Sequence, residues 1–157
     1  MEGRVGYALK RAQAALRGMM DTALAGHGLT TAQYAALAAL EADPGLSNAE
    51  LARRSFVTPQ TMIQVLALLE RDGLVERSPG RGRVLETRLT AEGAARVAAA
   101  HATVEGIEAR MLAGLDADDT ERLLGWLHGC ADRIAGPPAD GAEPAQPPGR
   151  GSSSSSN

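Results

Sequence analysis

Residues 46 to 90 constrain the fold of this chain more than any other segment. Ser47 and Glu50 have the spacing of a capping box, in which each side chain bonds the other residue's backbone N–H, so a helix is expected to begin at Ser47. Thr58 followed by Pro59 predicts a second helix, because threonine caps a helix and proline is tolerated at its first position. Two short helices are therefore expected in close succession.

The second helix is expected to run to Asp72 and to stop at Gly73, since glycine takes the left-handed conformation that often follows a helix. Only residues 55–57 separate the two helices, which is the length of the turn in a helix–turn–helix. The period of 3.6 places an apolar stripe on the second helix, and it should pack on Leu51 and Ala52 of the first. That stripe consists of Met62, Val65, Leu66 and Leu69.

The opposite face of the second helix carries Gln60, Thr61, Gln64 and, one turn on, Leu68, and no residue from 58 to 69 is charged. Glutamine suits the two-pronged edge of adenine, and threonine can donate, accept or contact the thymine methyl group. A neutral surface helix in an alanine-rich protein would show the same composition. The segment that follows favours contact with nucleic acid.

Residues 74–78 and 85–89 alternate apolar and polar side chains, which predicts two strands joined by the turn residues 79–83. Residues 77–88 of the hairpin contain four arginines against one acid, a local charge of +3 in a chain whose net charge is −3. Arginine pairs well with phosphate and enters narrow minor grooves. A solvated hairpin is the plainer explanation, but beside two such helices the hairpin predicts a basic wing that touches DNA.

The flanking segments read as amphipathic helices. The first carries Val5, Leu9, Ala12, Leu16, Met19 and Ala23 at helical spacing. A capping box at Thr30 and Gln33 starts the next helix, Thr90 caps a long helix after the hairpin, and Asp116 starts the last. A small isolated domain cannot bury all these stripes, so a homodimer is expected, with recognition helices about one DNA turn apart on a pseudo-palindromic site.

Three segments carry a resemblance to the MarR family of bacterial winged-helix regulators: LTTAQYAALAAL (29–40), LSNAELARRSFVTPQTMIQVLALLERDGLVER (46–77) and GRVLETRLTAEG (82–93). The resemblance implies a mainly α fold with a small β-hairpin wing, a winged helix–turn–helix domain and a helical dimerisation region. On this basis 30–89 should bind DNA, and 5–29 and 90–135 should dimerise. Independently of the resemblance, 136–157 is rich in proline, glycine and serine and cannot bury a core, so a disordered tail is expected.

The family usually has an Asp-x-Arg pair in the wing, whose arginine enters the minor groove. Arg83 takes the place of that arginine, whereas Arg81 stands where the acid is usual, which implies an additional phosphate contact. The expected function is sequence-specific binding of double-stranded DNA by a homodimeric regulator, more often a repressor than an activator. The expected DNA-contacting residues are Ser47, Thr58, Pro59, Gln60, Thr61, Gln64, Arg81 and Arg83.

The resemblance also implies release by a small aromatic or phenolic effector in a cleft between the dimerisation helices and the winged domain. Met19, Met20, Tyr34 and His101 are the candidates to line it, although such residues more often belong to a core or an interface. Cys130, the one cysteine, falls on an apolar face and is expected to be a structural thiol rather than a redox sensor. The three histidines lack the spacing of metal ligands, so no metal and no cofactor are expected.

No catalytic constellation is visible, so an enzyme is not expected. No apolar run reaches the length of a membrane span, no signal peptide is evident, and a bacterial cytoplasmic, nucleoid-associated protein is expected. One alternative stays open: a winged-helix module that binds protein, such as an antirepressor or assembly factor, without an operator. Loss of DNA binding on removal of the wing charges would separate the two.

Overall fold

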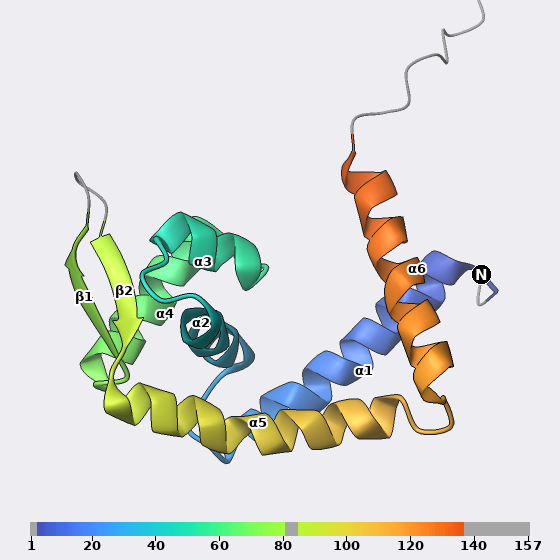
Figure 1. Ribbon diagram of the computed structural model, residues 1–157, viewed down its shortest axis with the longest axis horizontal. Helices are drawn as coiled ribbons and strands as arrows, with labels where there is room; N and C mark the ends of the chain where they lie inside the picture. Colours follow the sequence, from blue (N-terminus) through green and yellow to red (C-terminus); the bar gives the residue numbers. More distant parts are fainter. Residues whose placement is uncertain (1–2, 81–84, 137–157) are drawn as a thin grey trace, which may run out of the picture. The chain divides into compact units, whose positions relative to one another are not determined.

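The computed structural model describes residues 3–80 and 85–136. It divides into two compact units at Gly114. The first unit contains α1 (Val5–Ala25), α2 (Thr31–Ala42), α3 (Asn48–Arg54), α4 (Pro59–Arg71), β1 (Val75–Pro79), β2 (Leu85–Leu89) and α5 (Ala91–Met111), and the second contains α6 (Ala117–Ala135) (Figure 1). The expected mainly α fold with a small β-hairpin is confirmed.

Capping side chains begin the helices where the sequence predicts. Ser47 and Glu50 form a capping box at α3, and Thr30 and Gln33 form another at α2. The hydroxyl of Thr58 accepts from the backbone N–H of Thr61 at 3.1 Å, with Pro59 as the first residue of α4. The helix starts are therefore fixed by bonds within three residues, which is why the sequence reveals them.

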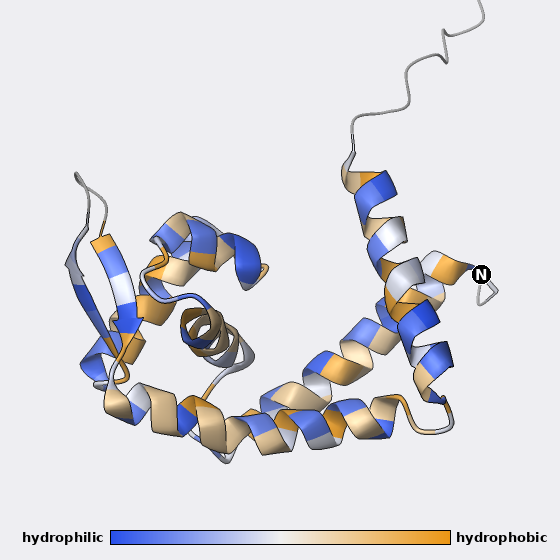
Figure 2. Ribbon diagram, in the orientation of Figure 1, coloured by the Kyte–Doolittle hydropathy of each residue, from blue (hydrophilic) through white to orange (hydrophobic). Residues whose placement is uncertain are grey.

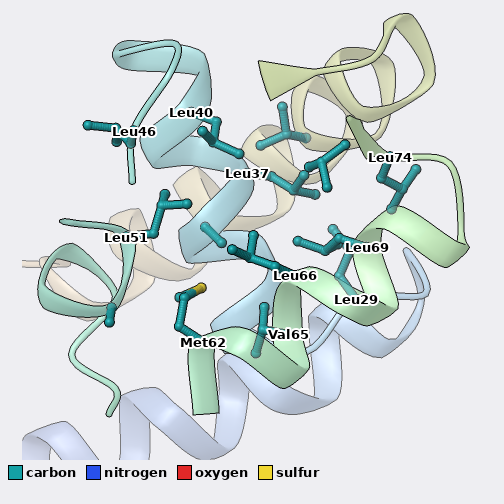
Figure 3. Close-up of a cluster of buried hydrophobic side chains, with 14 of the residues drawn as sticks. Leu29, Leu37, Leu40, Leu46, Leu51, Met62, Val65, Leu66, Leu69 and Leu74 are labelled. Atoms are coloured by element: carbon teal, nitrogen blue, oxygen red, sulfur yellow. The ribbon is translucent and has the colours of Figure 1, made fainter. Parts of the chain in front are cut away.

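The predicted apolar stripe of α4 is buried and faces the rest of the winged domain. Met62, Leu66 and Leu69 are fully buried and Val65 nearly so. They join Leu51 of α3 and the apolar residues of α2 in one cluster (Figure 3). The core therefore holds the helix–turn–helix on α2, so that the opposite face of α4 is turned to solvent.

The two strands pair antiparallel with Val75 opposite Leu89 and Pro79 opposite Leu85. The first strand begins one residue later than expected, because Leu74 completes the turn after α4 and is buried in the core. Leu46 forms an isolated antiparallel bridge with Thr87, which ties the entry to α3 to the second strand of the hairpin. The wing and the helix–turn–helix therefore form one body.

α1 lies against α2 and α5, but much of its apolar stripe is exposed: Val5 is 79% and Leu9 48% accessible. α6, taken by itself, has no buried residue, and Trp126 and Ile134 are largely exposed. Figure 2 shows the apolar residues interspersed along both helices. Cys130 is half-buried on α6. Within residues 3–80 and 85–136, no helix is long and apolar enough to cross a membrane.

Candidate nucleic-acid interface

The outer face of α4 presents neutral hydrogen-bonding groups to solvent. Gln60, Thr61 and Gln64 are all exposed. Among the described residues, no hydrogen bond occupies the amide of either glutamine. The hydroxyl of Thr58 donates to that of Thr61 at 2.9 Å, so Thr61 retains its own proton for an outside acceptor. This face can therefore offer donors and acceptors to base edges.

Ile63 also lies on this exposed arc, with 54% of its surface accessible. Helical spacing places Ile63 outside the buried stripe of α4, and an apolar side chain was not expected on a hydrogen-bonding face. On an exposed helix face between Gln60 and Gln64, an apolar side chain of this shape suits the thymine methyl group. Ile63 therefore belongs with the candidate base contacts.

The first turns of α3 and α4 are tied together. The side-chain amide of Asn48 donates to the carbonyl of Pro59 at 3.3 Å. The capping box uses the N–H groups of Ser47 and Glu50, and hydrogen bonds from Ser47 lower the pKa of the Glu50 carboxyl below its usual value. The N–H groups left at this helix end for a phosphate are consequently those of Asn48 and Ala49.

Two of the four arginines of the hairpin have acidic partners. A guanidinium nitrogen of Arg77 lies 3.9 Å from the carboxylate of Glu70, and Arg88 bonds the carboxylate of Glu86 at 3.1 Å. The basic charge predicted for the wing is therefore partly neutralised at its base. Arg81 and Arg83 lie outside the described residues.

A cavity of about 600 Å³ lies within the first unit, between α1, α2, the turn that joins α3 to α4, and α5. Its apolar wall includes Met20, Val57, Val104 and Ile107, and its polar lining includes Gln13, Arg17, Thr31 and Glu108. Arg17 is the cation among the lining residues. No periodic or capping signal marked these polar groups, because they come together only when α1 packs on α2 and α5.

The four residues predicted to line an effector cleft are separated in the structure. Met20 lines the cavity, whereas Met19 opens onto a smaller one of about 220 Å³ between α1 and α5. Tyr34 and His101 line neither and form a hydrogen-bonded chain with Glu41: Tyr34 Oη to His101 Nδ1 is 2.9 Å, and His101 Nε2 to Glu41 Oε2 is 2.6 Å. Burial raises the pKa of Tyr34, and the nearby glutamates raise it further.

A capped recognition helix with a neutral outer face, a three-residue turn and a paired-strand wing together define a winged helix–turn–helix protein. Within residues 3–80 and 85–136, no group of three or more His, Cys, Asp or Glu side chains is arranged to hold a metal ion.

Comparison with known proteins gives the family. The model of the MarR family matches residues 27–83. The HTH-type transcriptional repressor Rv2887 of Mycobacterium tuberculosis is 46% identical over 115 residues, which are 72% of this chain and 83% of the relative. The transcriptional regulator HosA of Escherichia coli O111:H- is 33% identical over 98 residues, 61% of this chain and 73% of the relative. The chain belongs to the MarR family of DNA-binding transcriptional regulators, which are not enzymes.

Solved structures of related regulators have the same fold as this chain. The crystal structure of Rv2887 with p-aminosalicylic acid has a TM-score of 0.68 and 40% identity, and covers 82% of this chain and 99% of that one. The repressor CouR bound to a 23-mer DNA duplex has a TM-score of 0.75 and 32% identity, and covers 83% of this chain and 94% of that one. Rv2887 has also been solved with DNA, with a TM-score of 0.67.

Proposed function

We propose that this protein is a repressor that binds a pseudo-palindromic operator as a homodimer and leaves it when a small aromatic carboxylate binds. The observation that carries the proposal is the exposed, uncharged face of α4 beside the wing. Named repressors among its relatives, and structures of two of them with DNA, support it.

Each element has a distinct part in this proposal. Gln60, Thr61 and Gln64 read base edges in the major groove, and Thr58 and Pro59 meet the adjacent phosphates at the start of α4. The helix end at Ser47 approaches a phosphate. Arg81 and Arg83 hold the flanking groove from the tip of the wing, and this assignment rests on the sequence.

The homodimer supplies the spacing that an operator requires. The exposed apolar stripe of α1 and the exposed apolar residues of α6 need a covering surface, which a second copy provides. We therefore assign 5–29 and 90–135 to dimerisation and 30–89 to DNA binding. A twofold axis would place the two recognition helices about 34–36 Å apart, one turn of DNA. A protein that acts on the chromosome works in the bacterial cytoplasm, at the nucleoid.

The cavity is the proposed effector site. Rv2887 has been solved with salicylic acid and with p-aminosalicylic acid. A volume of about 600 Å³ lies in the usual range for small-molecule sites, and a largely apolar wall suits an aromatic ring. Arg17 is placed to pair with the carboxylate, because its guanidinium is only weakly engaged by Asp21, 3.9 Å away.

The test begins with selection of random duplex DNA by the purified protein, followed by titration of the selected site at several salt concentrations. A pseudo-palindrome bound by a dimer with a steep salt slope is expected. Gln64→Ala should cost about 1–3 kcal/mol of binding free energy and relax preference at one position, whereas Arg83→Ala should weaken binding to all sequences alike. Arg71→Ala, which removes an exposed arginine at the far end of α4, is the control.

No enrichment above non-specific binding would instead support a winged-helix module that binds protein. Unchanged binding by Gln64→Ala would show that the outer face of α4 is not the reading face.

A further inference from the structure

The turn between α3 and α4 belongs to two sites at once. Its three residues, Ser55, Phe56 and Val57, all line the cavity. The next residue, Thr58, caps the recognition helix through the N–H of Thr61. Any molecule that occupies the cavity is therefore within one residue of the start of α4.

Phe56 combines two unfavourable properties. Among the described residues it is the one non-glycine residue with a positive φ, +54°, a conformation that L-residues with a side chain rarely adopt. Its side chain is also 96% exposed, which is unusual for a phenylalanine. Backbone bonds hold the turn in this form, since the N–H of Phe56 donates to Arg53 and that of Val57 to Ala52. A strained backbone conformation often marks a functional residue, and here it holds an aromatic ring in solvent, which points to a function for that ring.

Ser55 is a second, independent observation at the same place. This residue is 91% buried, and its hydroxyl oxygen has no hydrogen-bond partner within the part of the chain that the structure describes. Buried hydroxyls normally have a partner, because an unpaired one costs free energy. The turn therefore offers a ligand both an uncovered aromatic ring and an unused hydroxyl.

We propose that Phe56 packs against the ring of the aromatic carboxylate in the cavity and that this contact shifts the turn and the start of α4. This inference rests on the proposed effector and adds the residue that recognises the ring and transmits its presence. Ring-to-ring contact favours aromatic over aliphatic carboxylates, since offset and edge-to-face arrangements add to simple burial. The Ser55 hydroxyl takes the polar substituent of the ligand when the turn moves.

The experiment uses the full-length dimer and salicylate as the probe. Calorimetry gives the Kd of salicylate, and fluorescence anisotropy gives the Kd of the selected operator with and without saturating salicylate. Phe56→Ala should weaken salicylate binding by about tenfold or more and leave operator affinity without ligand within about twofold. Because the side chain is exposed, the variant should fold normally, which circular dichroism would check.

Two further variants separate contact from transmission. Phe56→Leu keeps apolar bulk without the ring and should favour aliphatic carboxylates relative to salicylate. Phe56→Gly relieves the strained backbone, so even at saturating salicylate the loss of operator affinity should be smaller than in the wild type. Leu68→Ala removes an exposed side chain of α4 that does not line the cavity, and its salicylate Kd should not change.

The outcomes are distinguishable. If the wild type binds the operator but salicylate neither binds nor releases it, the effector proposal fails and this inference fails with it. If the wild type responds to salicylate and Phe56→Ala binds it equally well, this inference alone is overturned. It is also overturned if Phe56→Ala changes only the dissociation of the dimer, because the ring would then belong to the subunit interface.

Discussion

Gly93 allows α5 to dock on the junction between α4 and the wing. It is the third residue of α5, and a Cβ built on it would lie 1.9 Å from the carbonyl oxygen of Leu74 and 2.9 Å from its carbon. The same carbonyl accepts from the backbone N–H of Thr90 at 3.1 Å, and the Thr90 hydroxyl donates to the carbonyl of Gly73 at 2.6 Å. A side chain at position 93 must therefore displace backbone.

Gly93→Ala should destabilise the protein. A Cβ contact must open from 1.9 Å to beyond 3.0 Å, a displacement of more than 1 Å in a packed region. Overpacking of this kind costs about 1–3 kcal/mol, and loss of the bond from Thr90 to Leu74 adds about 0.5–1.5 kcal/mol. The higher helix propensity of alanine offsets up to about 1 kcal/mol of this destabilisation. The net expectation is a loss of about 1–3 kcal/mol, which lowers Tm by about 3–10 °C.

The assay is urea and thermal unfolding at one fixed protein concentration, because the stability of a dimer depends on concentration. Gly106→Ala is the matched control, since it lies on the same helix and a Cβ there meets no atom of the described residues within 4 Å, apart from its chain neighbours and the backbone of its own helix. It should gain about 0.5–1 kcal/mol. If Gly93→Ala is as stable as the wild type, or if both substitutions change stability by the same amount, then α5 does not need a glycine to pack on Leu74.

Three further predictions concern the helix starts and the chain of bonds at Tyr34. Thr58→Ala should cost about 0.5–2 kcal/mol in urea unfolding, because it removes the cap of α4, and should weaken operator binding as well. The pKa of Glu50 is lowered in the folded state, so the stability it contributes is present above its unfolded pKa and lost as pH falls through the folded one. Glu50→Gln, which keeps a capping box, should flatten this acid limb of a pH-dependent unfolding series. The pKa of Tyr34 is raised above 10.0, so its contribution is complete below that pH and lost as pH rises through the folded pKa. Tyr34→Phe should remove that alkaline loss, and an unchanged alkaline limb would contradict the assignment.

The hydrogen bonds between distant residues of the first unit could not be predicted from the sequence. Tyr34 and His101 bond across 67 positions of the chain, and His101 and Glu41 across 60. The resemblance to the MarR family made Tyr34 and His101 candidates for the same cleft as Met20. The structure pairs the first two with each other and leaves Met20 at the cavity, because only the packing of α2 on α5 determines which side of each helix is covered.

The charge of the wing likewise could not be predicted from its own residues alone. The count of arginines predicted a basic hairpin, but Arg77 and Arg88 have acidic partners at its base. One of these, Glu70, belongs to α4 rather than to the hairpin, so no local count includes it. The net charge that a surface presents depends on neighbours that the fold supplies.

The sequence by itself determined the helix starts, the three-residue turn, the buried stripe of α4 and its neutral outer face. These features depend on residues three or four positions apart, whose interactions form within a single turn of helix. The tertiary structure alone decided the cavity and the requirement for glycine at position 93. Each of these depends on segments far apart in the chain coming within a few ångströms of one another, which no local pattern records.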